Sequence, residues 1–253
     1  MPSGFTSETI SLGRLLADPF GFRIPDYQRP YSWRTDEAEQ LLDDLFLELA
    51  LIEDGTAKDS GYFLGAVLLM ELPGADNASG TLRLYDIVDG QQRLVTITIL
   101  LAVIRDLAAD DGEAWASTAT PHIWTERKTG MEPRIQLRGR DGSFLRTYVQ
   151  EARASSVMPV DDELTVGMTH ILSVRAHLAN AILDHSIDEL KRLVSYLLNS
   201  CFFSLITTRS VDRAHRIFSV LNERGRPLAR NDILKAQILG GIASERQIGR
   251  AHV

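Results

Sequence analysis

The feature that most constrains this chain is an apolar segment, residues 94–107, that directly follows a short polar turn. Its sequence, LVTITILLAVIRDL, is longer than most strands and places apolar side chains on nearly every side of a helix. A helix that is apolar all round has to be enclosed by other elements. The segment is therefore predicted to be a helix that is buried on most sides.

Three further segments have the patterns of strands. Residues 62–72 form a continuous apolar run, a turn-rich stretch follows, and residues 81–89 alternate before they become apolar. This order predicts a hairpin. Residues 201–208 are rich in aromatic and β-branched side chains, which favour another strand.

Helical patterns occupy much of the remaining sequence. A short helix is predicted over residues 5–20, with Ile10, Leu12, Leu15 and Leu16 pointing inward. Thr35 is the predicted N-cap of a helix that runs to about Ile52. Further helices are predicted over residues 143–152, 162–184, 187–199, 211–225 and 226–239. Together with the strands, these helices predict an α+β fold with a large helical part.

The polar turn at residues 89–93, DGQQR, has the residue types of an anion site. It lies between a predicted strand and a predicted helix, where backbone N–H groups lack intrahelical partners and the helix dipole favours negative charge. Gly90 would let a ligand approach the backbone closely, and Arg93 could clamp phosphate oxygens with two hydrogen bonds.

Three side chains of the turn also suit catalysis. Gln91 and Gln92 can each donate and accept hydrogen bonds, so they could orient a water molecule. Asp89 would repel phosphates unless a cation lay between them, which predicts Mg²⁺ with Asp89 as a metal ligand. The alternative is purely structural: Asp89 caps the helix, Asp89–Gly90 forms a turn, and both glutamines face water.

A second polar segment, residues 21–33, contains two prolines that exclude a regular helix. Tyr27, Tyr31 and Trp33 could stack on a base or sugar, or they could anchor the segment to the core, which we favour for Tyr31 and Trp33. An apolar anchor does not need Gln28 and Arg29. These two residues are therefore candidates for contact with nucleotide, and Tyr27 and Gln28 are candidates for contact with DNA.

Other polar residues are weaker candidates. Asn222 and Arg224 lie at a predicted helix end, where they could face a nucleotide or, for the arginine, simply complement the helix dipole. Residues 126–146 contain six basic side chains against three acidic ones. Arg138 and Arg140 in this stretch are predicted to contact DNA, although a solvated polar surface is the favoured interpretation for any single arginine.

Bulk properties exclude several classes of protein. The net charge is −7, so DNA contact has to come from local patches rather than from a basic surface as a whole. A single cysteine, Cys201, excludes an intrachain disulfide framework and fits a reducing, cytoplasmic location. The sequence has no signal-peptide pattern and no apolar run long enough to cross a membrane.

Three separated segments together resemble a known family. They read FRIPDYQRPYSW at 22–33, YFLGAVLLM followed by YDIVDGQQRLVTITILLAVIRD within 62–106, and AHRIFSVLNERGRPLARNDILKA at 214–236. Their sequence, order and spacing resemble the N-terminal domain of GmrSD-type restriction endonucleases over most of residues 8–240. The motif Asp-Gly-Gln-Gln-Arg followed by Leu carries most of this resemblance.

The resemblance implies a ParB/sulfiredoxin-like fold, in which a small mixed sheet adjoins a large helical part. It further implies binding and hydrolysis of an NTP, GTP or ATP, with Mg²⁺, by Asp89, Gly90, Gln91, Gln92 and Arg93. Members of this family act in bacterial defence and recognise modified DNA, and many carry a C-terminal HNH-type nuclease domain. No HNH pattern is recognisable in this sequence, so a nuclease domain or subunit is expected elsewhere.

The expected domain covers residues 8–240. Its core is predicted to comprise residues 8–108, the strand 201–208 and helices within 210–240, with a mostly helical insert at 110–200. The last residues, 248–253, follow a helical pattern without capping logic and match the translation of a common sequencing adapter, so we expect this end to be artefactual. The functional alternatives left open are a non-catalytic, nucleotide-gated DNA-binding module and a nuclease-recruiting module. Whether the chain forms a homodimer is also left open.

Overall fold

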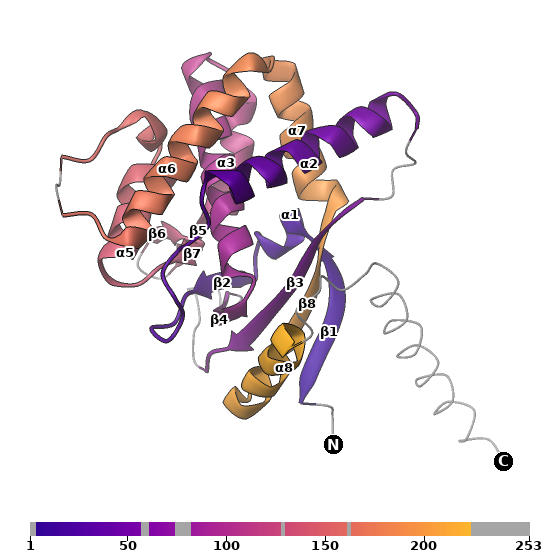
Figure 1. The fold of residues 1–253 in the computed structure, drawn as a ribbon, viewed down its shortest axis with the longest axis vertical. Helices are drawn as coiled ribbons and strands as arrows, with labels where there is room; N and C mark the ends of the chain where they lie inside the picture. Colours follow the sequence, from indigo (N-terminus) through magenta and orange to yellow (C-terminus); the bar gives the residue numbers. More distant parts are fainter. Residues whose placement is uncertain (1–3, 57–60, 74–81, 128–129, 161–162, 224–253) are drawn as a thin grey trace. The chain divides into compact units, whose positions relative to one another are not determined.

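The computed structural model describes residues 4–56, 61–73, 82–127, 130–160 and 163–223. The chain divides into two compact units, residues 1–214 and 215–253, and each is described by itself. The first unit combines a sheet with a group of helices, as Figure 1 shows. The predicted α+β class is therefore confirmed, whereas the ParB/sulfiredoxin-like identity of the fold stays a prediction.

The main sheet is mixed and follows the order β1-β8-β3-β4-β2-β7. β1 pairs antiparallel with β8, and β3 pairs antiparallel with β4, whereas the other neighbours are parallel. A separate hairpin consists of β5 and β6. The strands are β1 (Phe5–Ser11), β2 (Phe20–Arg23), β3 (Tyr62–Glu71), β4 (Arg83–Asp89), β5 (Trp124–Arg127), β6 (Gly130–Pro133), β7 (Ile135–Gln136) and β8 (Cys201–Thr208).

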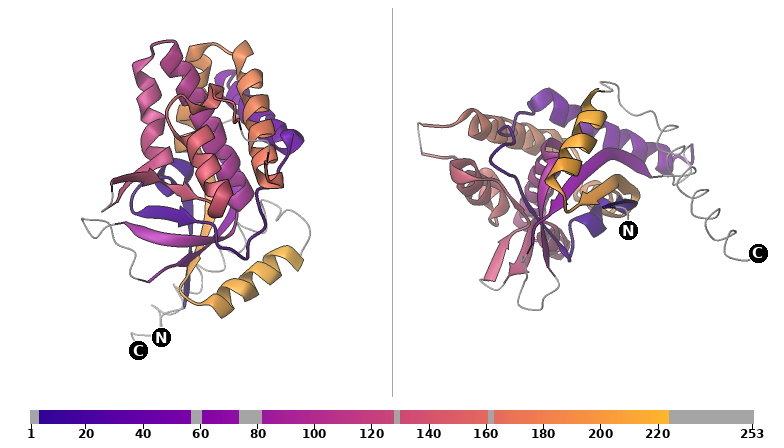
Figure 2. Two further views of the ribbon diagram at one scale, coloured as in Figure 1. Left: turned by 90° about the vertical axis from the view of Figure 1, so that its left-hand side faces the viewer. Right: turned by 90° about the horizontal axis from the view of Figure 1, so that it is seen from below.

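The longer helices of the first unit gather on one side of the main sheet, as Figures 1 and 2 show. α2, α3, α6 and α7 form this group. The helices of the first unit are α1 (Leu12–Leu15), α2 (Thr35–Glu53), α3 (Gln91–Asp110), α4 (Thr120–Ile123), α5 (Gly139–Leu145), α6 (Val166–Ala181) and α7 (Ile187–Ser200). Most of α8 (Val211–Glu223) belongs to the second unit. A π-helical turn, Arg146–Gln150, extends α5.

Helix α3 forms the centre of the core. Each of its residues from Leu94 to Asp106 is buried, which confirms the prediction made from its apolar sequence. Burying one large apolar side chain contributes about 1.5–3 kcal/mol. This helix therefore supplies much of the hydrophobic stabilisation and holds its first turn in a fixed place beside the sheet.

The predicted hairpin at 62–89, the strand at 201–208 and the helix beginning near Thr35 are confirmed, with Arg34 rather than Thr35 as N-cap. The helix predicted over residues 5–20 is wrong for its first half. Residues 5–11 form β1 instead, because Thr6, Thr9 and Ile10 are β-branched and the segment pairs along β8. The inward side chains Ile10, Leu12, Leu15 and Leu16 are nevertheless buried.

Two other segments differ from the sequence-based prediction. Residues 20–23 form β2, so the expected loop begins at Ile24. The segment 110–200 contains strands β5, β6 and β7 besides its helices, and β7 joins the main sheet. Its description as an insert in a separate core therefore stays a prediction. The helix predicted over 211–225 is α8, and the one predicted over 226–239 lies outside the described residues.

Candidate functional site

The turn between β4 and α3 depends on the glycine at position 90. Gly90 is the N-cap of α3 and has φ of 95°, a left-handed conformation that L side chains rarely adopt. A Cβ at this position would lie 2.8 Å from Cγ2 of Val67 and 3.3 Å from the carbonyl oxygen of Ala66. Only glycine therefore lets β4 turn directly into α3 against β3.

Asp89 ends β4 and occupies a largely buried position. Its Oδ1 accepts a hydrogen bond of 2.8 Å from the backbone N–H of Gly90. Burial raises the pKa of the Asp89 carboxyl above its ordinary value, although this hydrogen bond and the positive charges of Arg93 and Arg29 lower it in part. Asp89 thus lies close to two guanidinium groups contributed by different segments of the chain.

Arg93 lies in the first turn of α3, and its guanidinium lies against the backbone of β3. A Cβ at Gly65 would be 2.9 Å from Nη1 of Arg93, so the missing side chain at Gly65 makes room for the cation. Gly65 has φ of 110° and lies where the pairing of β3 with β8 shifts register. Within the described residues, Arg93 forms no hydrogen bond or ion pair with another side chain.

Tyr62 and Asp44 lie near this cation. The Tyr62 hydroxyl donates a hydrogen bond of 2.8 Å to Oδ2 of Asp44 on α2. Burial raises the pKa of Tyr62, this hydrogen bond raises it further, and the charge of Arg93 lowers it in part. No sequence motif pointed to Tyr62 or Asp44. Gly65 did carry a signal, since an isolated glycine within an apolar strand marks a bulge or a close approach of another group.

The side-chain amide of Gln92 forms hydrogen bonds with the backbone of the loop that precedes α2. Its Oε1 accepts hydrogen bonds from the N–H groups of Ser32 and Trp33, at 2.9 and 3.2 Å. Its Nε2 donates to the carbonyl oxygen of Pro30, at 3.5 Å. The structural alternative, in which both glutamines face water, is therefore wrong for Gln92.

Gln91 and Gln28 make similar contacts between the two segments. Nε2 of Gln91 donates to the carbonyl oxygen of Arg29 at 3.1 Å, and Nε2 of Gln28 donates to that of Val88 at 2.7 Å. Gln91 is only 5% exposed, and its Oε1 has no hydrogen-bond partner among the residues that the structure describes. Gln91 does not face water either, because it lies beneath the loop.

The three aromatic residues of the loop differ in how deeply they are buried. Tyr31 is buried, and its hydroxyl forms a 2.7 Å hydrogen bond with Oγ1 of Thr96 on α3, which confirms its predicted anchoring role. Trp33 packs partly buried against the core. Tyr27 is 57% exposed, so it stays a candidate for stacking on a ligand.

The predicted DNA contacts form a looser group. Arg138 forms an ion pair with Asp26, the residue directly before Tyr27, so Arg138 and Tyr27 lie near each other. Arg140 is exposed and donates to the carbonyl oxygen of Glu163. Arg134, in the same basic stretch, is buried against the Asp18 carboxylate and backbone carbonyl oxygens, so the stretch is not one continuous basic surface.

The remaining predicted residues have no described side-chain geometry. The backbone of Asn222 belongs to α8, but its side chain is not described, and Arg224 lies outside the described residues. No group of three or more His, Cys, Asp or Glu side chains that could hold a metal ion occurs in the described ranges. Mg²⁺ with Asp89 as a ligand therefore stays a prediction.

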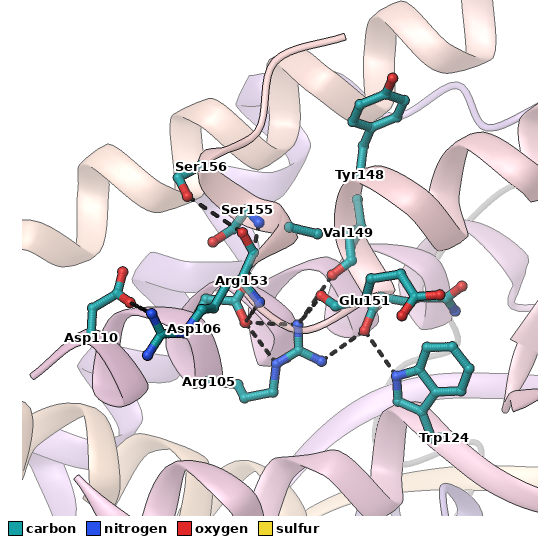
Figure 3. Close-up of polar contacts among 12 residues, drawn as sticks. Arg105, Asp106, Asp110, Trp124, Tyr148, Val149, Glu151, Arg153, Ser155 and Ser156 are labelled. Carbon is teal, nitrogen blue, oxygen red and sulfur yellow. Dashed lines mark hydrogen bonds and ion pairs between the residues drawn. The ribbon is translucent and has the colours of Figure 1, made fainter. Parts of the chain in front are cut away.

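The other end of α3 carries a second polar cluster, which Figure 3 shows. Arg105 is 5% exposed, and its guanidinium contacts Oδ1 of Asp106 and the carbonyl oxygens of Gln150 and Glu151 at 2.6–2.8 Å. The Asp106 carboxylate accepts hydrogen bonds from the N–H groups of Arg153 and Ser155, each at 3.0 Å. This cluster fastens the segment after α5 to α3, and its buried polar atoms all have partners.

The fold and the site define an α+β domain in which a buried helix presents its N-terminus beside a carboxyl and two arginines. A family model described as GmrSD restriction endonuclease, N-terminal domain, matches residues 12–239. The chain belongs to this family, as its motifs predicted. Comparison with curated proteins gives no match. Among the described residues, no helix has both the length and the apolar character needed to cross a membrane.

Proposed function

We propose that this chain is an NTP-binding and NTP-hydrolysing sensor domain of a modification-dependent restriction or anti-phage defence system. Nucleotide hydrolysis is coupled to recognition of modified DNA. Membership of the GmrSD restriction endonuclease N-terminal domain family supports this assignment. The nuclease activity belongs to an HNH-type domain or partner subunit rather than to the residues described above.

The observation that carries the proposal is that Asp89 ends β4 directly before the first turn of α3, near enough to Arg93 and Arg29 for both charges to act on its carboxyl. The N–H groups of this turn and the two guanidinium groups would bind the oxygens of a triphosphate. Asp89 would hold Mg²⁺, which neutralises phosphate charge when it is bound. Neither arginine forms an ion pair with another described side chain that would compete for these phosphates.

One contact set favours the alternative, a nucleotide-gated DNA-binding or nuclease-recruiting module without turnover. The amide group of Gln92 already bonds to three backbone groups, and Nε2 of Gln91 is bonded to Arg29. Gln92 therefore has no acceptor left with which to orient an attacking water. In this alternative the nucleotide acts as a ligand that holds the domain in one state.

The test is turnover and binding of GTP, ATP and CTP with Mg²⁺, with and without glucosylated or phosphorothioate DNA. Arg93→Ala is expected to weaken nucleotide binding about 10- to 100-fold, because a charge-assisted hydrogen bond contributes about 1.5–3 kcal/mol. Arg14→Ala, an exposed arginine on α1, is the matched control. Binding without multiple turnover would select the alternative, and a wild type that binds no nucleotide would end both.

A further inference from the structure

Hydrogen bonds fasten the loop of residues 27–33 to the turn at 89–93. Gln92 spans from α3 to the N–H groups of Ser32 and Trp33, 60 and 59 residues earlier in the chain. Because a carbonyl oxygen has two lone pairs, these two N–H groups use the full acceptor capacity of Gln92 Oε1. Gln92 therefore acts on the loop rather than on a ligand.

Two further hydrogen bonds hold the same loop near residues 28 and 29. Gln91 bonds to the carbonyl oxygen of Arg29, and Gln28 bonds to the carbonyl oxygen of Val88, the residue directly before Asp89. The backbone of residues 28 and 29 consequently lies beside the end of β4. The side chain of Arg29 is exposed, but its backbone is fixed from both sides.

An arginine side chain loses considerable rotamer freedom when it is ordered, about 2 kcal/mol for a fully immobilised chain. A fixed backbone lowers this cost at the moment a ligand binds, because fewer dihedral angles remain to be restrained. The loop therefore makes Arg29 a better-placed cation than its exposed position alone would suggest.

We propose that Gln92 is a positioning residue, which helps to hold the loop so that the backbone of Arg29 stays beside the end of β4 and its side chain serves as the second cation for a phosphate ligand. The phosphate ligand rests on the function proposed above. Arg93 and Arg29 then differ in origin: Arg93 belongs to α3 itself, whereas Arg29 reaches the site only through the loop. Loss of Gln92 should remove the contribution of Arg29 and leave that of Arg93.

The first experiment needs no nucleotide. Amide hydrogen exchange is measured in the wild type, Gln92→Ala and Gln92→Glu, with Gln40→Ala on the exposed face of α2 as matched control.

Amide hydrogen exchange separates loop placement from general damage to the fold. In Gln92→Ala the Ser32 and Trp33 amides should exchange at least about tenfold faster, while buried amides of α3 keep their wild-type rates. Gln92→Glu retains the acceptor oxygen and should restore slow exchange at both positions. Equal exchange in the wild type and in Gln92→Ala would show that Gln92 does not hold the loop.

The second experiment is a double-variant cycle on the dissociation constant of Mg²⁺-ATP and Mg²⁺-GTP. Arg29→Ala and Gln92→Ala should each weaken binding about tenfold, and together about tenfold rather than a hundredfold, because both remove the same contact. Fully multiplicative effects would contradict the proposal. If amide exchange at Ser32 and Trp33 behaves as expected but no nucleotide binds, Gln92 still positions the loop and the proposed function fails.

Discussion

The two ends of helix α3 carry polar clusters of similar composition but opposite character. Arg105 and Asp106, near its C-terminus, are buried and contact each other and several backbone groups of the segment 149–155. Arg93 and Asp89, at its N-terminus, lie near each other, and Arg93 forms no hydrogen bond or ion pair with a described side chain. The polar groups of the Arg105–Asp106 cluster are bonded to one another and to the backbone, whereas Arg93 is available to bind a ligand.

The difference shows how hydrogen-bond satisfaction separates structural from functional polar groups. A buried polar group without a partner costs about 1–3 kcal/mol, so a cluster that serves only the fold is expected to be complete. The cluster at Arg105 meets this expectation. The cluster at the N-terminus does not, because burial disfavours the charge of Asp89 and no donor in the described part of the chain reaches Oε1 of Gln91.

The largest effect on stability is expected at the Arg105–Asp106 cluster. Arg105→Ala should lower the free energy of unfolding by about 3–5 kcal/mol, because it leaves Asp106 and the carbonyl oxygens of residues 149–151 buried without their cation. Urea denaturation measures this change. Arg153→Ala, which removes an exposed pair with Asp110, is the control and should cost at most about 1 kcal/mol. A loss at Arg105 as small as at Arg153 would mean that the cluster does not support the fold.

The next largest effect on stability is expected at Gly90, in the turn between β4 and α3. Gly90→Ala combines a strained left-handed conformation with a clash against Val67, and it should cost about 1–3 kcal/mol of stability. Gly112→Ala is a sharp control, because Gly112 also has positive φ but nothing lies within 4 Å of its Cβ position. The difference between the two variants in thermal or urea unfolding measures the close approach of β3 alone. Equal losses would remove the argument that Gly90 packs against β3.

Arg93→Ala tests whether the two arginines of α3, Arg93 and Arg105, differ in their contribution to stability. Because Arg93 is only partly buried and forms no ion pair with a described side chain, its loss should change the free energy of unfolding by less than about 1 kcal/mol. The same substitution at Arg105 should cost several times more. Urea denaturation of both variants under identical conditions gives the ratio. Comparable losses would place Arg93 among the structural arginines and weaken its assignment to a ligand.

Asp89→Asn should have the smallest effect on stability, and in the opposite direction. The folded-state pKa of Asp89 is raised by burial, so ionisation destabilises the folded protein once the pH exceeds the ordinary value of 3.8. Asparagine removes this penalty and can still accept the hydrogen bond from Gly90. The melting temperature should therefore rise at pH 7, and the gain should disappear as the pH falls below 3.8. A destabilised Asp89→Asn at neutral pH would show that the carboxylate is held by stronger favourable contacts.

Much of the fold could be predicted from local patterns. The apolar run after Leu94 predicted the buried helix, the alternation before Asp89 predicted the hairpin partner, and both elements are present. The β1 strand was missed because the residues that favour it also fit a short amphipathic helix, and only pairing with β8 selects the strand. Gly90 was predicted to allow the close approach of a ligand, whereas the group that lies against it in the structure is β3, and the sequence alone does not distinguish the two.

The motif identified Asp89, Gln91, Gln92 and Arg93 as candidate site residues, but it did not distinguish their tasks. Gln91, Gln92 and Gln28 are the same residue type. Only the folded chain shows that their side-chain amides form hydrogen bonds with backbone groups some 60 residues away. Likewise, Arg93 and Arg105 differ because of the partners that the fold brings to each. Local sequence determines which hydrogen-bonding groups are available, whereas tertiary structure determines which of them are already satisfied.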